Sequence, residues 1–289
     1  MNETAITFEC GGASLVGIVH PSATPARRGI VFVVGGGPQY RVGGHRQLTQ
    51  WSRIVAAAGT PVLRFDYTGM GDSHGGFRGF EQIQDDICSA IDELVSRIPE
   101  IQEVVLWGEC DAASAILFYA WQDPRVQGLV LLNPWVRTAA GEAKAILHSY
   151  YLSRLMQPSF WRKVASLRFN PVASLRSAIG VVRRSRSTAP SSGRTSAAAT
   201  TDIQARLPLP DRLLEGLRRF GGPVLLVLSG RDLVAREFEE LLRISPAWQS
   251  EFARRQITRH VLPEGDHTFS SATQRARVVA WALDWLRSW

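Results

Sequence analysis

The chain has 289 residues, of which 45% are hydrophobic and 20% are charged, as in ordinary globular proteins. This length suits one large α/β domain or two ordinary domains. The net charge of +7 comes from scattered arginines, and no basic stripe with interleaved aromatic residues is visible, so nucleic-acid binding is not expected.

Cysteine usage and the first residues indicate the compartment. Cys10, Cys88 and Cys110 are too few and too scattered for a disulfide framework or a zinc site. Residues 1–10 contain two glutamates and lack the apolar core of a signal peptide. No apolar run reaches the about 20 residues that span a bilayer. We therefore expect a cytoplasmic protein without stable membrane insertion.

The first half of the chain alternates between strand-like and helix-like segments. Residues 6–8 and 14–20 flank two glycines and predict an opening β-hairpin. Further strands are expected at 30–34, at 61–66, from Val104 onward and at 126–132, and helices at 48–58, 83–95 and 112–121. Such alternation is typical of a doubly wound, mostly parallel sheet with helices on both faces.

A glycine run, Gly35-Gly36-Gly37-Pro38, ends the strand at 30–34. A phosphate-binding loop would need the Lys-Ser/Thr of a Walker motif, which is missing. The alternatives are a plain turn and a loop whose backbone N–H groups hold an oxyanion. Because Pro38 has no N–H, the donor in such a loop would be Gly37 or Gln39.

The run Gly108-Glu109-Cys110-Asp111-Ala112 joins a predicted strand to a predicted helix. It has the layout of a nucleophile elbow, in which small residues allow a sharp turn that exposes one reactive side chain. Cys110 holds the reactive position, and we expect the helix N-terminus to lower the pKa of its thiol. On this motif alone, a buried and inert cysteine is an equally good interpretation.

The segment 136–220 interrupts the alternation. It contains helix-like pieces at 141–155 and 160–167 and no convincing strand, which predicts a helical lid inserted into the core. Within it, residues 183–201 are rich in Ser, Thr, Ala and Arg, and we expect them to be poorly ordered. An insertion packed on the core is the alternative. Aromatic side chains that would line a substrate pocket under the lid are Trp135, Tyr150, Tyr151 and Trp161.

The alternation resumes after residue 220. Strands are predicted at 223–228 and 257–262, with a helix at 234–243 between them. The last helix starts near residue 271 and carries three tryptophans at four-residue spacing, a stripe that we assign to core packing. The predicted core therefore comprises residues 1–135 and 221–289.

Three polar residues come directly after predicted strands, and their order along the chain is informative. Cys110, Asp232 and His267 each come directly after a strand, in the chain order nucleophile, acid, base. Asp266 and Asp111 are alternative acids. Neither follows a strand of its own, so Asp232 is preferred.

The chain as a whole resembles the α/β-hydrolase superfamily. The stretches 35–47, 64–73 and 107–112 further resemble the exosortase A system-associated hydrolase 1 family, whose bacterial members accompany exopolysaccharide and protein-sorting loci. The superfamily resemblance implies the α/β-hydrolase fold and a triad, whereas the closer one implies a genomic context without a defined substrate. Cys110 stands where the superfamily usually has serine, and the glycine loop lacks the usual preceding histidine.

These observations predict an acyl hydrolase of the esterase or thioesterase type. Cys110 would attack a small-molecule acyl substrate, His267 would carry the proton and Asp232 would orient the imidazole. The N–H of Asp111, with that of Gly37 or Gln39, would hold the oxyanion. Acyl transfer to an amine or alcohol, and a binding protein without chemistry, are the alternatives. No cofactor or metal is expected, and the oligomeric state is not predicted.

Overall fold

The structure is a computed structural model that describes residues 3–37, 39–137 and 207–289. The chain divides into two compact units, Met1–Val136 with Leu209–Trp289, and Arg137–Pro208. The first unit carries the fold and the site described below. The predicted lid helices at 141–155 and 160–167 and the segment 183–201 lie outside the described residues, so the lid stays a prediction.

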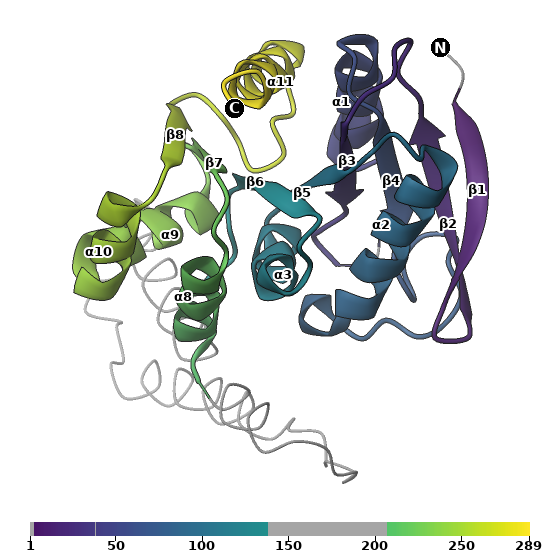
Figure 1. Cartoon of the computed structure of the whole chain (residues 1–289). Helices are drawn as coiled ribbons and strands as arrows, with labels where there is room; N and C mark the ends of the chain where they lie inside the picture. The colour runs from purple at the N-terminus through teal and green to yellow at the C-terminus, as the bar shows by residue number, and fades with distance from the viewer. Residues whose placement is uncertain (1–2, 38, 138–206) are drawn as a thin grey trace, which may run out of the picture. The chain divides into compact units, whose positions relative to one another are not determined.

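An eight-stranded sheet forms the centre of the first unit (Figure 1). Its strand order is β1-β2-β4-β3-β5-β6-β7-β8. Strand β2 pairs antiparallel with β1 and β4, and all other pairs are parallel. The strands are β1 (Thr4–Cys10), β2 (Ala13–His20), β3 (Arg28–Val33), β4 (Val62–Asp66), β5 (Glu103–Glu109), β6 (Val126–Leu132), β7 (Val224–Ser229) and β8 (Ile257–Leu262).

Helices cover both faces of this sheet. Helices α1 and α11 pack together on one face, and α2, α3 and α8 lie on the other (Figure 1). The helices are α1 (Gln47–Ala57), α2 (Gln84–Arg97), α3 (Asp111–Tyr119), α8 (Leu209–Arg219), α9 (Leu233–Ile244), α10 (Pro246–Arg254) and α11 (Ala272–Leu286). The predicted α/β-hydrolase architecture, with its mostly parallel sheet, is confirmed.

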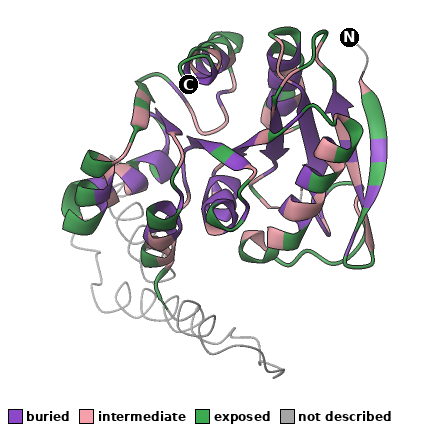
Figure 2. Cartoon of the chain, in the orientation of Figure 1, coloured by how far each residue is buried: buried purple, intermediate pink, exposed green. Residues whose placement is uncertain are grey.

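Burial follows the position of each strand in the sheet (Figure 2). All five residues of β4 and all six of β7 are buried, as expected for strands covered on both faces. Edge strand β1 instead alternates between exposed and buried residues. The tryptophan stripe of the last helix also packs as predicted, because Trp285 is buried and Trp281 and Trp289 lie against the core.

Two helices, α8 and α10, were not predicted. Helix α8 falls in the range assigned to the insertion, 136–220, yet Leu213, Leu214 and Leu217 are buried and the helix groups with the core unit. It approaches α3 so closely that a Cβ at Gly216 would lie 2.2 Å from the Leu117 carbonyl oxygen. The core therefore resumes at α8 rather than after it.

Candidate active site

The sharp turn between β5 and α3 presents Cys110. Its φ is +58°, a left-handed value that is rare outside glycine and is typical of strained functional turns. The turn needs a glycine at 108, because a Cβ there would come within 2.6 Å of the Ala112 backbone. The Cys110 N–H donates to the Leu132 carbonyl at the end of β6, which holds the turn against its neighbouring strand.

Asp232 and His267 follow β7 and β8, and β6 lies between these two strands and β5 in the sheet. The Asp232 carboxylate caps α9 by accepting from the N–H groups of Val234 and Ala235, which fixes its position. Its Oδ2 lies 2.9 Å from His267 Nδ1. Cys110 lies with His267 in the wall of one cavity, and each of the two side chains shifts the pKa of the other. The structure therefore brings near one another the three residues that the sequence places after three parallel strands, β5, β7 and β8.

The alternative acids have other partners. Asp266 accepts from the backbone N–H and the hydroxyl of Ser270. The Asp111 carboxylate accepts from the Gly36 N–H at 2.7 Å. Among the described contacts of the three candidate acids, only those of Asp232 include a hydrogen bond with His267.

The charges of these groups depend on one another. The hydrogen bond that Asp232 accepts from His267, followed by the effect of the neighbouring Cys110, raises the pKa of His267 to about 11. Burial raises the pKa of the Cys110 thiol, although His267 opposes this shift. The expectation that the helix N-terminus gives a lowered thiol pKa was therefore wrong, because the cost of desolvating a buried thiolate outweighs the helix end. His267 and, to a smaller extent, the backbone N–H of Asp111 favour the thiolate.

The glycine loop after β3 is built around the Asp111 carboxylate. A Cβ on Gly35 would lie 2.5 Å from Asp111 Oδ1, so glycine permits the close approach. Burial raises the pKa of Asp111, while the backbone N–H groups of Gly36, Ala112 and Gly37 counteract part of that shift. Backbone N–H groups of the glycine loop, which were expected to bind an oxyanion, therefore face the Asp111 carboxylate. This contact was not predicted from the sequence.

A buried ionic cluster ties the same loop to the loop after β4. The Arg41 guanidinium contacts both Asp66, which is fully buried, and Asp72 at 2.9 Å, and the Arg41 backbone N–H also donates to Asp66. Gly71 leaves room for this carboxylate, because a Cβ there would lie 2.2 Å from Asp66 Oδ2. Asp66 thus positions the segment that follows Gln39.

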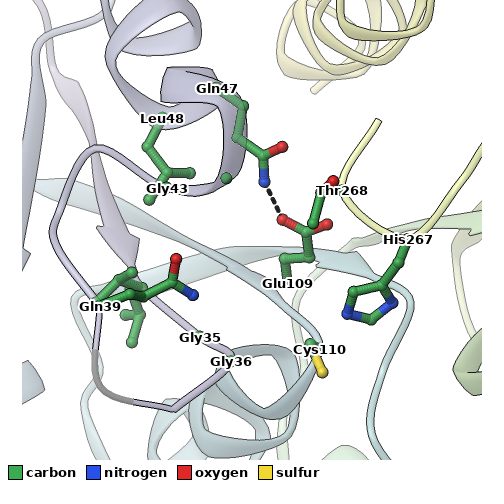
Figure 3. A pocket seen from close by; sticks show the side chains of 13 residues that line it. Gly35, Gly36, Gln39, Gly43, Gln47, Leu48, Glu109, Cys110, His267 and Thr268 are labelled. Atoms are coloured by element: carbon green, nitrogen blue, oxygen red, sulfur yellow. Dashed lines mark hydrogen bonds between the residues drawn. The ribbon is translucent and has the colours of Figure 1, made fainter. Parts of the chain in front are cut away.

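A cavity of about 230 Å³ opens beside Cys110 and His267 (Figure 3). Its wall is formed by the glycine loop, the start of α1, the elbow and the loop after β8. The lining residues are Val33, Val34, Gly35, Gly36, Gln39, Gly43, Gly44, Gln47, Leu48, Glu109, Cys110, His267 and Thr268. The predicted donor Gln39 lies in this wall, whereas Gly37 does not.

The aromatic pocket candidates are only partly described. Trp135 follows β6, its N–H donates to the Cys110 carbonyl, and its own carbonyl accepts from the Ser114 hydroxyl at 2.5 Å. It is not among the residues that line the cavity. Tyr150, Tyr151 and Trp161 lie outside the described residues, so their predicted role stays a prediction.

The described part of the chain contains neither a candidate metal site nor a candidate membrane-spanning helix. Within residues 3–37, 39–137 and 207–289, no three His, Cys, Asp or Glu side chains gather in a way that could hold a metal ion. Over the same residues, no helix combines the length and apolar character needed to cross a bilayer.

Comparison with known proteins agrees with this architecture. The model of the alpha/beta hydrolase family matches residues 30–281. The fold is similar to that of the Pyrococcus furiosus esterase Pf2001, with a TM-score of 0.64 and 12% identity over 100% of this chain and 93% of that one. The esterase domain of a Rhodothermus marinus protein gives a TM-score of 0.59 and 18% identity, over 99% of this chain and 98% of that one.

A third similar structure is Est1E from Butyrivibrio proteoclasticus with bound ferulic acid, with a TM-score of 0.60 and 13% identity over 98% of each chain. No curated protein matches the sequence. At such identities the structural likeness extends to the fold alone, whereas the family model covers most of the chain. The protein therefore belongs to the alpha/beta hydrolase family.

Proposed function

We propose that this protein is an acyl hydrolase that cleaves small-molecule esters or thioesters through a covalent intermediate on Cys110. The observation that carries the proposal is the hydrogen bond between Asp232 and His267, with Cys110 beside His267 in the wall of one cavity. Each of the three residues follows a parallel strand of the same sheet. Each member is an unremarkable residue alone. Together they provide a nucleophile, a proton carrier and a group that orients the carrier.

The proposed reaction starts from a Cys110 thiolate paired with the His267 imidazolium. The thiolate attacks the acyl carbonyl carbon and forms a C–S bond, and His267 donates its proton to the leaving alcohol or thiol as the original bond breaks. His267 then takes a proton from water, which attacks the acyl-enzyme. The C–S bond breaks, the carboxylic acid leaves and the ion pair is restored. Asp232 holds the imidazole and stabilises its cation throughout.

The oxyanion requires a change at Asp111. We propose that the backbone N–H of Asp111 and a donor of the glycine loop, Gly37 or Gln39, bind the oxyanion. The Gly36 N–H donates to the Asp111 carboxylate, and the neighbouring Gly37 N–H also lowers the pKa of this carboxyl group. Gly37 therefore becomes fully available only when that side chain moves or loses its charge. A donor of this type typically contributes about 2.7–4 kcal/mol to transition-state stabilisation, so the position of Asp111 affects the rate directly.

We further propose that the closer relatives are the exosortase A system-associated hydrolases and that the protein acts in the cytoplasm. The motif stretches 35–47, 64–73 and 107–112 support the first point, and the scattered cysteines support the second. The three cysteines are free in the structure, which agrees with a reducing compartment.

A panel of p-nitrophenyl esters and acyl thioesters of graded chain length tests the proposed function. The parent protein is expected to release free acid, whereas Cys110→Ala is expected to have no turnover and an unchanged melting temperature. Cys88→Ala is the matched control, because it removes a partly exposed thiol away from the cavity. Adding amine or sugar-alcohol acceptors separates hydrolysis from transfer. If Cys110→Ala retains turnover, the proposed role of Cys110 is wrong.

A further inference from the structure

A second polar pair lies in the cavity wall beside the triad. Gln47, in the first turn of α1, is only 2% exposed, and its Nε2 donates to Oε2 of Glu109, the residue directly before Cys110 (Figure 3). Both side chains line the cavity. The proposed acyl transfer assigns them no role.

Each member of this pair keeps one buried oxygen without a partner. Gln47 Oε1 and Glu109 Oε1 are both shielded from solvent and accept or donate no hydrogen bond. Buried polar atoms in folded proteins are nearly always paired, because leaving one unpaired is costly. Two such atoms on neighbouring residues that line the same cavity therefore indicate that a ligand supplies the missing partners.

The protonation state of Glu109 defines which partner fits. Burial raises the pKa of Glu109 to about 8, against opposing effects of His267 and Gln47, while Asp232 and Asp266 push it in the same direction. At neutral pH the carboxyl group is therefore mostly protonated and offers an O–H donor. Gln47 Oε1 offers an acceptor. A hydroxyl group, which accepts one hydrogen bond and donates another, satisfies both.

We propose that Gln47 and Glu109 bind a hydroxyl group of the substrate, so that the protein acts on hydroxylated acyl compounds rather than on plain hydrocarbon acyl chains. This inference rests on the proposed function of the same site. An ammonium group has no acceptor for the carboxyl proton, and an alkyl chain would leave both oxygens unpaired. The hydroxyl can belong to the acyl group or to an acceptor alcohol, and the experiment separates the two.

The cavity limits the size of this substrate. Its volume of about 230 Å³ exceeds that of a cavity that holds benzene, about 150 Å³, but falls below the about 300–1,000 Å³ of sites for drug-sized ligands. An acyl group of about four carbons is therefore a suitable probe. Sites that hydrogen-bond a substrate hydroxyl discriminate strongly against analogues that lack it, up to about 10⁴–10⁵-fold, because their polar groups are then left unpaired.

Matched thioesters test the inference. Butyryl, 3-methylbutyryl and the 2-, 3- and 4-hydroxybutyryl thioesters of one leaving thiol differ in the hydroxyl while remaining similar in size. We expect kcat/KM for at least one hydroxylated substrate to exceed that of both hydrocarbon substrates by about tenfold or more. In a second arm, partition of the butyryl-enzyme between water and glycerol or propanol shows whether the hydroxyl belongs to an acceptor.

Three variants identify the residues that create the preference. Gln47→Met removes the unpaired acceptor, and the preference is expected to fall to within about twofold of unity. Glu109→Gln replaces the carboxyl donor with an amide donor, so the preference is expected to remain. Gln50→Met is the matched control, because Gln50 lies on the same helix and accepts from Arg275 rather than lining the cavity. Melting temperatures show whether each variant is folded.

Binding to Cys110→Ala separates this inference from the proposed function. Butyramide and the three hydroxybutyramides are compared by ligand-observed NMR, which needs no turnover. Preferential binding of a hydroxylated amide supports the inference even if no thioester is cleaved. The inference is overturned if the hydroxylated and plain compounds perform equally in all arms, or if Gln47→Met retains the preference. Turnover without preference would leave the proposed function intact.

Discussion

The contact between Asp111 and the glycine loop leads to an unusual expectation, namely that removing a charge beside Cys110 increases the reaction rate. Asp111 Oδ1 accepts from the Gly36 N–H at 2.7 Å, in the loop whose Gly37 or Gln39 N–H we propose as an oxyanion donor. Its negative charge also raises the pKa of the Cys110 thiol. Asp111→Asn keeps the shape of the side chain, removes the negative charge and leaves a weaker, neutral acceptor for the Gly36 N–H.

The size of this effect follows from the free energy of the hydrogen bond between the Gly36 N–H and the Asp111 carboxylate, which has to weaken before the loop can hold the oxyanion. A hydrogen bond to a charged group contributes about 1.5–3 kcal/mol, more than a neutral one. A neutral hydrogen bond contributes about 0.5–1.5 kcal/mol, so about 1–1.5 kcal/mol is recovered when the carboxylate becomes an amide. The rate is then expected to increase by about 5- to 13-fold, at 1.36 kcal/mol for each factor of ten. The backbone N–H of residue 111 is unchanged by the substitution.

The assay is kcat/KM for p-nitrophenyl butyrate, with the alkylation rate of Cys110 by iodoacetamide as a second readout that requires no substrate. Asp111→Asn is expected to increase both. Asp284→Asn, which removes an exposed carboxylate on α11, is the charge control and is expected to change neither. A folded Asp111→Asn protein with reduced kcat/KM would refute the reasoning, because the carboxylate would then assist the reaction.

Three further predictions concern stability and the geometry of the site. Asp66→Asn weakens the contacts of Asp66 with Arg41, which keeps Asp72 as a partner. It is expected to lower the free energy of unfolding by about 1–3 kcal/mol in urea melts, and to lower kcat/KM as the loop loosens. The pKa of His267 is raised in the folded state, so its interaction with Asp232 stabilises fully below the unfolded value of about 6.5, and this contribution is lost as pH rises towards about 11. The difference in melting temperature between the parent and His267→Gln is thus expected to shrink from pH 6 to pH 10, and a constant difference would contradict the shift. Gly108→Ala forces a Cβ to within 2.6 Å of the α3 backbone and is expected to lower the melting temperature by several degrees, whereas an unchanged melt would show that the turn tolerates a side chain.

Hydrophobic periodicity, together with glycine and proline at the ends of segments, was sufficient to predict most of the fold. Each of the eight strands was anticipated, because buried apolar runs bounded by glycine or proline are strong signals. Helices α8 and α10 were missed although each has a proline in its first turn, at Pro210 and Pro246, where proline is favoured. For α10, the preceding Ser245 is a further start signal that could have found the helix.

The site was predictable as far as it depends on chain order. Cys110, Asp232 and His267 each follow a strand, so a parallel sheet brings them to one edge. The contacts between Gly36 and Asp111 and between Gln47 and Glu109 join residues 75 and 62 positions apart, and no local pattern encodes them. The prediction of a lowered thiol pKa for Cys110 was wrong for a related reason. The helix end is visible in the sequence, whereas the degree of burial is not.

Trapping the covalent intermediate tests the central proposal most directly. The protein is mixed with an excess of an acyl thioester, quenched in acid within its first turnovers and digested, and the peptides are analysed by mass spectrometry. We expect one acyl group per chain on the peptide that contains Cys110, a slower appearance of this adduct in His267→Gln, and none in Cys110→Ala. Turnover of the thioester with the acyl group on another residue, or with no covalent adduct under conditions that trap it, would contradict the proposed role of Cys110.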